Sequence, residues 1–236
     1  MWYILSGVFG AVIGSFLNVI IYRLPREGLK LWDPLCSFCP HCGHRLSIRD
    51  NIPIFSYMLL RGRCRYCDAK IPLRYFLVEV FNASLYPLIW WLSHDIVVTF
   101  AGWILVSVLL AIAFMDLETW HIHDSLLLSL FVVSLFLAWR MGNLFYGAIT
   151  AAGAFILFYI LYRFKRGLGF GDVLMVGAAG FYMDIFTFDI ALLIAAVTGL
   201  IYAFVKYKGF KPKEKIPFGP FLSFGFIFGL IIKLWR

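Results

Sequence analysis

Charged residues are scarce in this 236-residue chain: Asp, Glu, Lys and Arg make up 14% of it, whereas hydrophobic residues make up 62%. The mean hydropathy is +0.87. A water-soluble domain has no way to bury so much apolar surface, whereas a lipid bilayer solvates it. The composition therefore excludes a soluble domain and predicts an all-α protein that crosses a membrane several times.

Apolar stretches approaching the ~20 residues of a membrane-spanning helix recur along the chain. No basic residue precedes the first of them, so we do not expect a cleavable signal peptide. One polar segment lies between the first apolar stretch and the others, so we predict three parts: a first transmembrane helix (1–22), a cytoplasmic cysteine-rich domain (23–75) and a transmembrane domain (76–236). The eight predicted spans are residues 2–22, 76–93, 96–115, 125–139, 143–162, 173–188, 189–205 and 217–235.

Acidic residues are fewer than basic ones, 13 against 21, and 18 of the basic residues lie within 23–75, 163–166 and 206–215. Eight alternating spans put these three segments on one side of the membrane, and Lys and Arg collect on the cytoplasmic side. We therefore expect the N-terminus to lie outside the cell. We also expect the weakly apolar span 173–188 to cross the membrane. The net charge of +8 then reflects topology and contact with anionic lipid headgroups. A nucleic-acid partner is not expected.

Cysteines number only five, yet four of them form two C-x-x-C pairs separated by 21 residues. Four thiolates satisfy tetrahedral zinc and leave no open position for a catalytic water. A reducing cytoplasm disfavours disulfides, so we predict a structural zinc ion, with reduced thiols or disulfides as the alternatives. Cys36 is expected to be a spare thiol, and His41 and His44 are expected to be solvated. The predicted ligands are Cys39, Cys42, Cys64 and Cys67.

Two aspartates stand at the predicted cytoplasmic boundary, Asp116 at the end of the third span and Asp172 at the start of the sixth. Neighbouring carboxylates hold one proton between them. One member can then deprotonate water while the other polarises a peptide carbonyl, as in aspartic proteases. Gly169 and Gly171 in the G-x-G-D motif would let a substrate backbone approach Asp172. The alternative role for Asp172 is a helix N-cap. The aspartates expected on the outer side are Asp95, Asp184 and Asp189.

Four motifs in this order resemble the type IV prepilin peptidases, which are bifunctional leader peptidase/N-methyltransferases. The motifs are GAVIGSFLNVIIYRLP (10–25), the cysteine segment 39–79, MDLETWHIHD (115–124) and GFGD (169–172). The resemblance implies eight helices in the bacterial inner membrane and catalysis by Asp116 and Asp172. The resemblance also implies that Asp124 belongs to the active-site loop with Gly169 and Gly171. His123 replaces the family's usual proline before Asp124, which favours the alternative that Asp124 is the N-cap of the fourth span.

The resemblance also implies the substrates and the second reaction. Prepilins and pseudopilins of type IV pili and type II secretion would be cut at the cytoplasmic face, after a glycine and before a hydrophobic residue, usually phenylalanine. S-adenosylmethionine would then methylate the new N-terminal residue.

No G-x-G-x-x-G motif follows a strand, so binding of S-adenosylmethionine rests on the resemblance alone. We expect its site where the first span, the cysteine-rich domain and the second span meet. Glu79 lies a few residues into an apolar span, where a carboxylate is costly and is usually functional or paired. Its charge would neutralise the sulfonium of the methyl donor or the new amine of the substrate. Alternatively, Glu79 would form a structural ion pair with Arg74. Gly14, Ser15 and Asn18 line the same region or allow close helix packing.

Three alternative functions fit parts of the pattern. Boundary aspartates also suit a proton-coupled transporter, although neither acidic residues at the bilayer midplane nor repeated halves are visible. An assembly scaffold would use the cysteine-rich domain for docking and the aspartates as helix caps. A peptidase that lacks methyltransferase activity is the third alternative.

Overall fold

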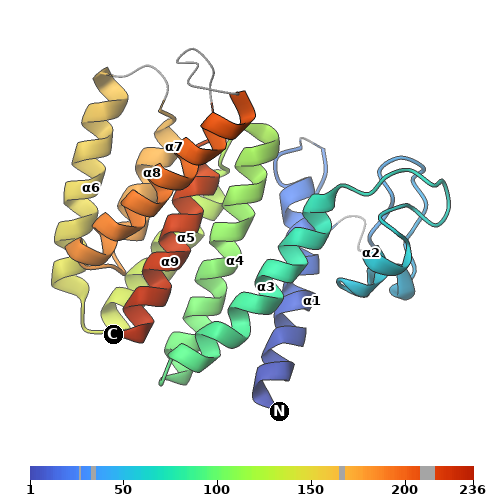
Figure 1. Cartoon of the computed structure of the whole chain (residues 1–236), viewed down its shortest axis with the longest axis horizontal. Helices are drawn as coiled ribbons and strands as arrows, with labels where there is room; N and C mark the ends of the chain where they lie inside the picture. The colour runs from blue at the N-terminus through green and yellow to red at the C-terminus, as the bar shows by residue number, and fades with distance from the viewer. Residues whose placement is uncertain (27, 33–35, 165–167, 208–215) are drawn as a thin grey trace. The chain divides into compact units, whose positions relative to one another are not determined.

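The computed structural model describes residues 1–26, 28–32, 36–164, 168–207 and 216–236. Within these residues the protein is all-α, as the sequence predicts, and only two isolated β-bridges accompany the helices. The chain divides into two compact units, Met1–Trp91 and Leu92–Arg236. Figure 1 shows the helices of both units.

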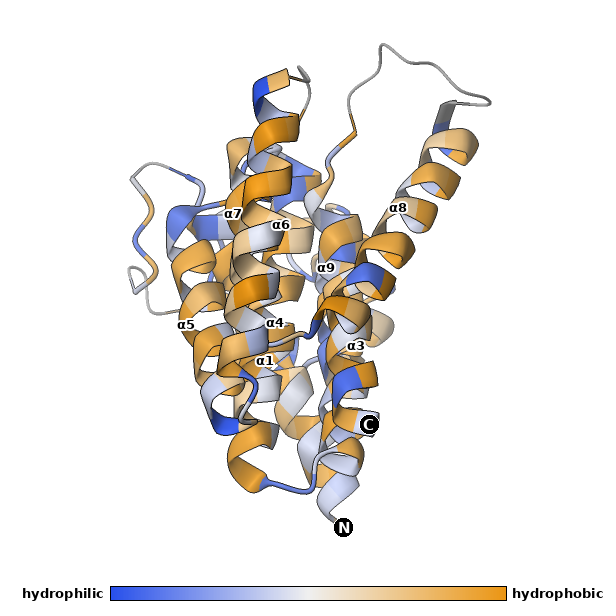
Figure 2. Ribbon diagram, turned by 90° about the vertical axis from the view of Figure 1, so that its left-hand side faces the viewer, coloured by the Kyte–Doolittle hydropathy of each residue, from blue (hydrophilic) through white to orange (hydrophobic). Residues whose placement is uncertain are grey.

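Among the residues that the structure describes, five helices are long and apolar enough to cross a membrane, which supports the predicted multi-pass membrane protein. Figure 2 shows that hydrophobic residues cover most of their length. Two further apolar helices are shorter, so the number of eight crossings stays a prediction. The five candidate spans are Trp2–Arg23, Leu73–Leu92, Ile96–Thr119, Leu144–Phe164 and Ile185–Lys206.

The first unit contains two long helices, α1 (Trp2–Arg23) and α3 (Leu73–Leu92), and the cysteine-rich segment between them. This segment carries the short helices η1 (Ile48–Asn51) and α2 (Phe55–Leu59). Glycine lets α1 approach α3 closely, because an ideal Cβ on Gly14 would lie 2.7 Å from the Cα of Glu79.

Within the described residues, the second unit is a bundle of six helices, and α4 is largely buried. α4 packs on α5 and α9, α7 on α5 and α6, and α8 on α9. Successive helices reverse direction, so the end of α4 and the starts of α5, α7 and α9 meet at one end of the bundle (Figure 1). The helices are α4 (Ile96–Thr119), α5 (Asp124–Arg140), α6 (Leu144–Phe164), α7 (Phe170–Gly180), α8 (Ile185–Tyr207) and α9 (Gly219–Trp235).

The predicted boundary between the spans 173–188 and 189–205 is wrong, because α7 ends at Gly180 and α8 begins at Ile185. An ideal Cβ on Gly180 would lie 2.6 Å from the Cα of Ala151, so α7 is held tightly against α6 where it ends. The carboxylate of Asp184 then accepts hydrogen bonds from the amide and hydroxyl of Thr187 in the first turn of α8. With 11 residues, α7 is about 16 Å long, roughly half the hydrocarbon thickness.

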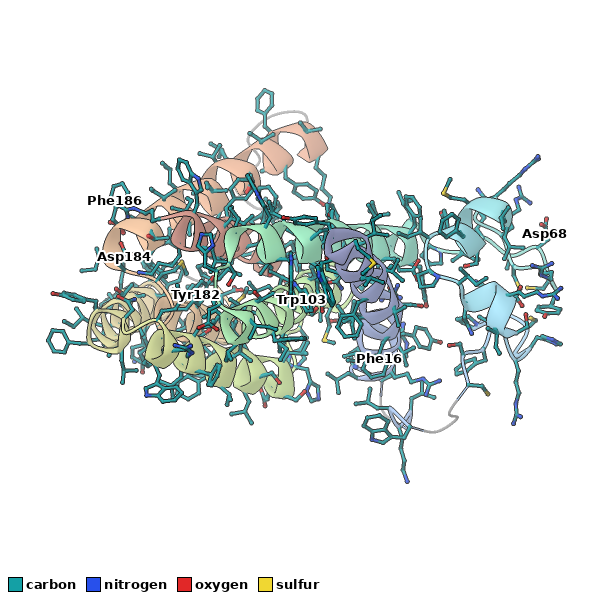
Figure 3. All side chains as sticks on the ribbon, turned by 90° about the horizontal axis from the view of Figure 1, so that it is seen from below. Phe16, Asp68, Trp103, Tyr182, Asp184 and Phe186 are labelled. Carbon is teal, nitrogen blue, oxygen red and sulfur yellow. The ribbon has the colours of Figure 1, made fainter. Side chains whose placement is uncertain are left out.

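The turn between α7 and α8 is anchored in the interior of the second unit. Tyr182 is fully buried, and its hydroxyl donates a 2.6 Å hydrogen bond to the carbonyl of Phe226 in α9. Figure 3 shows Tyr182 among the helices, with Asp184 and Phe186 nearer the outer edge. These contacts hold α7 in place beside α9.

Candidate functional site

Asp116 lies in the last turn of α4 and is 6% exposed. The amide of Gly219, the first residue of α9, donates a 3.0 Å hydrogen bond to its Oδ2 atom. An ideal Cβ on Gly219 would lie 2.8 Å from the same oxygen, so this approach requires glycine. The carboxylate is thus held by a backbone donor that is 103 residues distant in the sequence.

Asp172 lies in the first turn of α7 and is 8% exposed. Its Oδ2 atom accepts a 3.2 Å hydrogen bond from the amide of Gly169. The N-cap residue is Gly169 itself, so Asp172 stabilises the start of the helix from inside its first turn and not as the N-cap. An ideal Cβ on Gly169 would lie 3.3 Å from the Asp172 carboxylate, whereas one on Gly171 would make only ordinary contact with Ile122.

The connection between α4 and α5 helps to bring the two aspartates together. Ile122 is buried in this connection and packs on the start of α7 at Gly171. The charge of Asp116 acts electrostatically on the carboxyl group of Asp172. Two nearly buried carboxyl groups, each bonded to a backbone amide, therefore lie at the same end of the second unit and within electrostatic reach of one another. We call them the Asp116–Asp172 pair.

The prediction that Asp124 caps the fourth span is wrong. His123 is the N-cap of α5, and its ring nitrogen Nδ1 accepts a 3.2 Å hydrogen bond from the amide of Ser125. Asp124 is the first helical residue and is exposed. Asp124 instead lies at the edge of an apolar cavity beside α5.

Gly219 is a site residue that the motifs do not identify. It stands in the segment IPFGPF (216–221), at the start of the last apolar run and next to Pro220. Its location on the predicted cytoplasmic side is the only sequence signal for a role near Asp116, because the contact depends on how α4 and α9 pack.

The four predicted metal ligands come together in the cysteine-rich segment, where their sulfur atoms all lie within 4.8 Å of one another. The Cys39 and Cys67 sulfurs are 3.8 Å apart, close to the ~3.8 Å between two thiolates bound tetrahedrally at 2.3 Å from zinc. This donor set therefore fits a metal ion. Cys36 is not part of the cluster.

The two C-x-x-C turns have matching backbone geometry. The amide of Gly43 donates to the carbonyl of Cys39 at 2.9 Å, and the amide of Asp68 donates to the carbonyl of Cys64 at 3.0 Å. Gly43 and Asp68 both adopt left-handed conformations, with φ of 69° and 57°. Each turn therefore directs its two thiols to the same side.

Asp50 joins the rest of the segment to the second C-x-x-C turn. Its carboxylate accepts hydrogen bonds from the Ser47 hydroxyl at 2.8 Å, the Arg65 guanidinium at 2.8 Å and the Tyr66 hydroxyl at 3.0 Å. Desolvation opposes its ionisation, but these bonds outweigh desolvation and lower the pKa of Asp50 to about 2. An ionised carboxylate thus helps to order this small segment at neutral pH.

The residues predicted to bind the methyl donor also lie together, within the first unit. Glu79 is 8% exposed and accepts a 2.7 Å hydrogen bond from the amide of Ile54, and the Ser15 hydroxyl lies near its carboxylate. Asn18 is 3% exposed and donates to the carbonyl of Tyr75 at 3.0 Å, while its Oδ1 atom is buried without a hydrogen-bond partner. Gly14 allows close packing of α1 on α3, as the alternative prediction for this residue states, because it lies directly against Glu79.

The backbone at Ile54 is strained. Its φ and ψ are 67° and −54°, and the amide of Phe55 donates to the carbonyl of Pro53 at 2.7 Å, which forms a γ-turn. This conformation is rare for a β-branched residue and persists only where the surroundings enforce it. Glu79 provides part of that restraint through the Ile54 amide.

Known proteins are similar to both units. A family model described as Bacterial Peptidase A24 N-terminal domain matches residues 8–93, and one described as Type IV leader peptidase family matches residues 103–204. No solved structure matches the chain.

Several relatives named prepilin leader peptidase/N-methyltransferase match nearly the whole chain. The one from Pectobacterium carotovorum subsp. carotovorum is 32% identical, over 98% of this chain and 94% of its own length. The relative from Legionella pneumophila is 34% identical, over 99% of this chain and 91% of its own length. The relative from Burkholderia pseudomallei (strain K96243) is 34% identical, over 92% of this chain and 81% of its own length.

Proposed function

Because the chain belongs to the type IV leader peptidase family, we propose that it cleaves the basic leader from prepilins and pseudopilins and then methylates the new N-terminal residue. The observation that carries the peptidase half is the Asp116–Asp172 pair, nearly buried at one end of the second unit. The relatives are enzymes by name, which disfavours the transporter and scaffold alternatives.

The proposed cleavage needs only the pair and one water molecule. The ionised carboxylate takes a proton from water, whose oxygen attacks the carbonyl carbon of the glycine before the scissile bond. The protonated carboxyl group polarises the carbonyl oxygen. When the C–N bond breaks, a proton passes to the leaving amine of the hydrophobic residue, often phenylalanine. The amides of Gly169 and Gly219 hold the two carboxyl groups in position throughout.

We infer that the reactive end of the second unit faces the cytoplasm of a bacterial inner membrane, with the N-terminus outside. Arg163 and Lys206 lie in the last turns of α6 and α8, at the same end of the bundle as the Asp116–Asp172 pair. Basic residues collect on the cytoplasmic side. A prepilin carries a basic leader ahead of an apolar segment, so its scissile bond would meet the pair at this boundary.

Incubating the purified protein in detergent with a prepilin peptide and a labelled methyl donor tests both activities. Mass spectrometry of the products is expected to show the free leader and a mature peptide that carries one additional methyl group. An intact peptide contradicts the peptidase, whereas a cut but unmethylated peptide contradicts only the methyltransferase.

Gly219→Ala is expected to lower the kcat/KM of cleavage by about a hundredfold, because the added methyl group displaces the Asp116 carboxylate. The matched control is Gly153→Ala in α6, where an added Cβ meets nothing within 4 Å. Rates on one prepilin peptide compare the two variants. Equal activity of Gly219→Ala and wild type would show that the position of Asp116 is not critical.

We propose that the four clustered cysteines hold a structural zinc ion, which would link the two C-x-x-C turns. Replacing Cys39 and Cys64 together by serine is expected to remove the metal and make residues 36–72 sensitive to protease. Metal analysis of purified protein is expected to give about one zinc per wild-type chain and none in this variant. Cys36→Ser is the control and should retain the metal; loss of zinc from it would contradict the assignment.

We propose that the methyltransferase site lies in the first unit, at Glu79, Ser15 and Asn18. S-adenosylmethionine, when bound, supplies a methyl group to the substrate amine. The residues fit such a ligand, because Asn18 has a buried acceptor atom without a partner and Glu79 brings a negative charge suited to a sulfonium or an amine. The first helix (1–22), the zinc domain (23–75) and the beginning of the predicted transmembrane domain (76–236) would then carry the methyltransferase, and the remainder of that domain would carry the peptidase.

A further inference from the structure

The short helix α2 of the cysteine-rich segment exposes an apolar face. Phe55, Met58 and Leu59 have exposed fractions of 64%, 61% and 81%. Their spacing of three and four residues puts them on one side of the helix, which leaves Tyr57 on the opposite side. We call these three residues the α2 face. Adjacent large apolar side chains that are exposed in this way mark an interaction surface.

The opposite side of α2 is fastened to the candidate membrane span α3. The ring of Tyr57 stacks on the ring of Phe76, with the centroids 5.3 Å apart. The amide of Ile54, just before α2, donates a 2.7 Å hydrogen bond to the carboxylate of Glu79. Phe76 and Glu79 both belong to α3, and all four residues lie in the first unit. Figure 1 accordingly shows α2 level with the first turns of α3 and not beyond its end.

These two contacts set the depth of α2 in a membrane. The 20 residues of α3 make it about 30 Å long, which is the thickness of the hydrocarbon layer, so Leu73 lies near one membrane boundary. Along the helix axis, Phe76 is then about 4–5 Å and Glu79 about 9 Å from Leu73. A helix that lies flat at a membrane surface buries its apolar face by ~5–10 Å. The contacts therefore hold α2 at the depth of an interfacial helix.

Charge distinguishes a lipid surface from an apolar protein partner. Arg49 lies in η1, which contacts α2, and Arg61 follows α2 by two residues. These two arginines and Lys70 are exposed, whereas two other arginines of the segment form ion pairs with aspartates. Basic residues beside an apolar face attract anionic phospholipids. An apolar helix on the α2 face would bring no counter-ions for these charges, but phospholipid phosphates supply them.

We propose that α2 is an interfacial anchor. The α2 face inserts among the lipids at the membrane boundary near Leu73, and Arg49, Arg61 and Lys70 bind the phosphates of anionic phospholipids. The cysteine-rich segment is thereby held against the membrane surface and not suspended in the water beyond it. This inference does not depend on the proposed peptidase, and its tests need no turnover.

Fluorescence quenching measures the depth of the α2 face. The full chain carries an environment-sensitive fluorescent amino acid in place of Leu59, in vesicles of phosphatidylcholine and phosphatidylglycerol. We expect a nitroxide on the upper acyl chain to quench it more strongly than iodide, which is present on both sides of the membrane. The control carries the same amino acid in place of Asp68, whose side chain is 75% exposed and lies at the outer edge of the segment in Figure 3. Iodide should be the stronger quencher there.

Other patterns of quenching would overturn the proposal. Iodide quenching at position 59 as strong as that at position 68 would place the α2 face in water. Protection from both quenchers would mean that protein covers it, either the second unit or another copy of the chain. Strongest quenching by a nitroxide at the end of the acyl chain would place it too deep for an interfacial helix. Equal lipid quenching in vesicles of phosphatidylcholine alone would contradict the role of the three basic residues.

Met58→Glu gives a second test that leaves Leu59 in place. The new carboxylate opposes insertion between anionic headgroups and acyl chains, so trypsin should cut after Arg61 about threefold faster or more in the same vesicles. Met58→Leu is the matched control, because it keeps an apolar side chain of similar size, and it should be cut at the wild-type rate. Equal thermal unfolding of the two variants in detergent checks that both remain folded. A Met58→Glu variant that is cut no faster than Met58→Leu would overturn the anchor.

Discussion

Asp116→Asn and Asp172→Asn are each expected to lower the rate of prepilin cleavage by about a thousandfold or more. Asparagine keeps the shape of aspartate and still accepts the amide hydrogen bond of Gly219 or Gly169. It neither takes a proton from water nor returns one to the leaving amine. The double variant should be no slower than either single one, because the two carboxylates act as a unit.

Asp189→Asn is the matched control for both variants, because Asp189 is an exposed residue of α8 outside the reactive end. It should cleave at the wild-type rate. Thermal unfolding in detergent then checks that the inactive variants remain folded. A folded Asp116→Asn or Asp172→Asn that cleaves like Asp189→Asn would contradict the mechanism. Additive losses in the double variant would show that the two residues act separately.

Glu79→Gln is expected to lower methylation of the cleaved peptide by about a hundredfold and to leave cleavage unchanged. Glutamine still accepts the hydrogen bond from the Ile54 amide, so the strained turn is kept, but the negative charge that we assign to a sulfonium or an amine is lost. Mass spectrometry of the mature peptide measures both activities in one reaction. Binding of the methyl donor to the variant, measured by calorimetry, should weaken as well.

A peptide supplied already cut separates the two reactions. Asp172→Asn should methylate it at the wild-type rate, because we assign methylation to residues of the first unit, whereas Glu79→Gln should not. Full methylation by Glu79→Gln would leave Glu79 only its structural role at Ile54. Loss of cleavage in Glu79→Gln would contradict separate sites for the two reactions.

Hydrophobicity alone predicts seven of the eight apolar helices of the described residues at nearly their observed positions, because each needs an apolar stretch regardless of its neighbours. It misses the break after Gly180. There the chain remains apolar, and the helix ends because Gly180 packs against Ala151 and Asp184 caps the next helix. Both causes depend on packing between helices and on one side-chain hydrogen bond, which average hydropathy does not represent.

The candidate site is predictable where spacing alone determines it. The four-cysteine cluster is predictable because each C-x-x-C pair forms a local turn, and the four sulfur atoms come together as the spacing predicts. Gly219 and the capping role of His123 do not follow from spacing. The Gly219 amide at the start of α9 donates a hydrogen bond to the Asp116 side chain of α4. At α5, the His123 imidazole takes the place of the expected Asp124 cap and accepts a hydrogen bond from the Ser125 amide.

The apolar cavity beside α5, α6 and α7 is likewise not predictable from the sequence. Its wall residues read as ordinary parts of three apolar spans, and the cavity depends on which faces of α5, α6 and α7 leave space between them. Small residues such as Ala152 and Gly177 give no sign of this, since the same residue types also mark close helix packing, as at Gly14.

Single-turnover cleavage in water enriched in heavy oxygen tests most directly whether two aspartates activate water. With enzyme in excess over the prepilin peptide, the first leader released should carry one heavy oxygen in its new carboxylate, because the attacking oxygen comes from solvent. A first-turnover leader with only light oxygen would mean that an enzyme carboxylate had attacked the peptide. That result would contradict the proposed role of the Asp116–Asp172 pair.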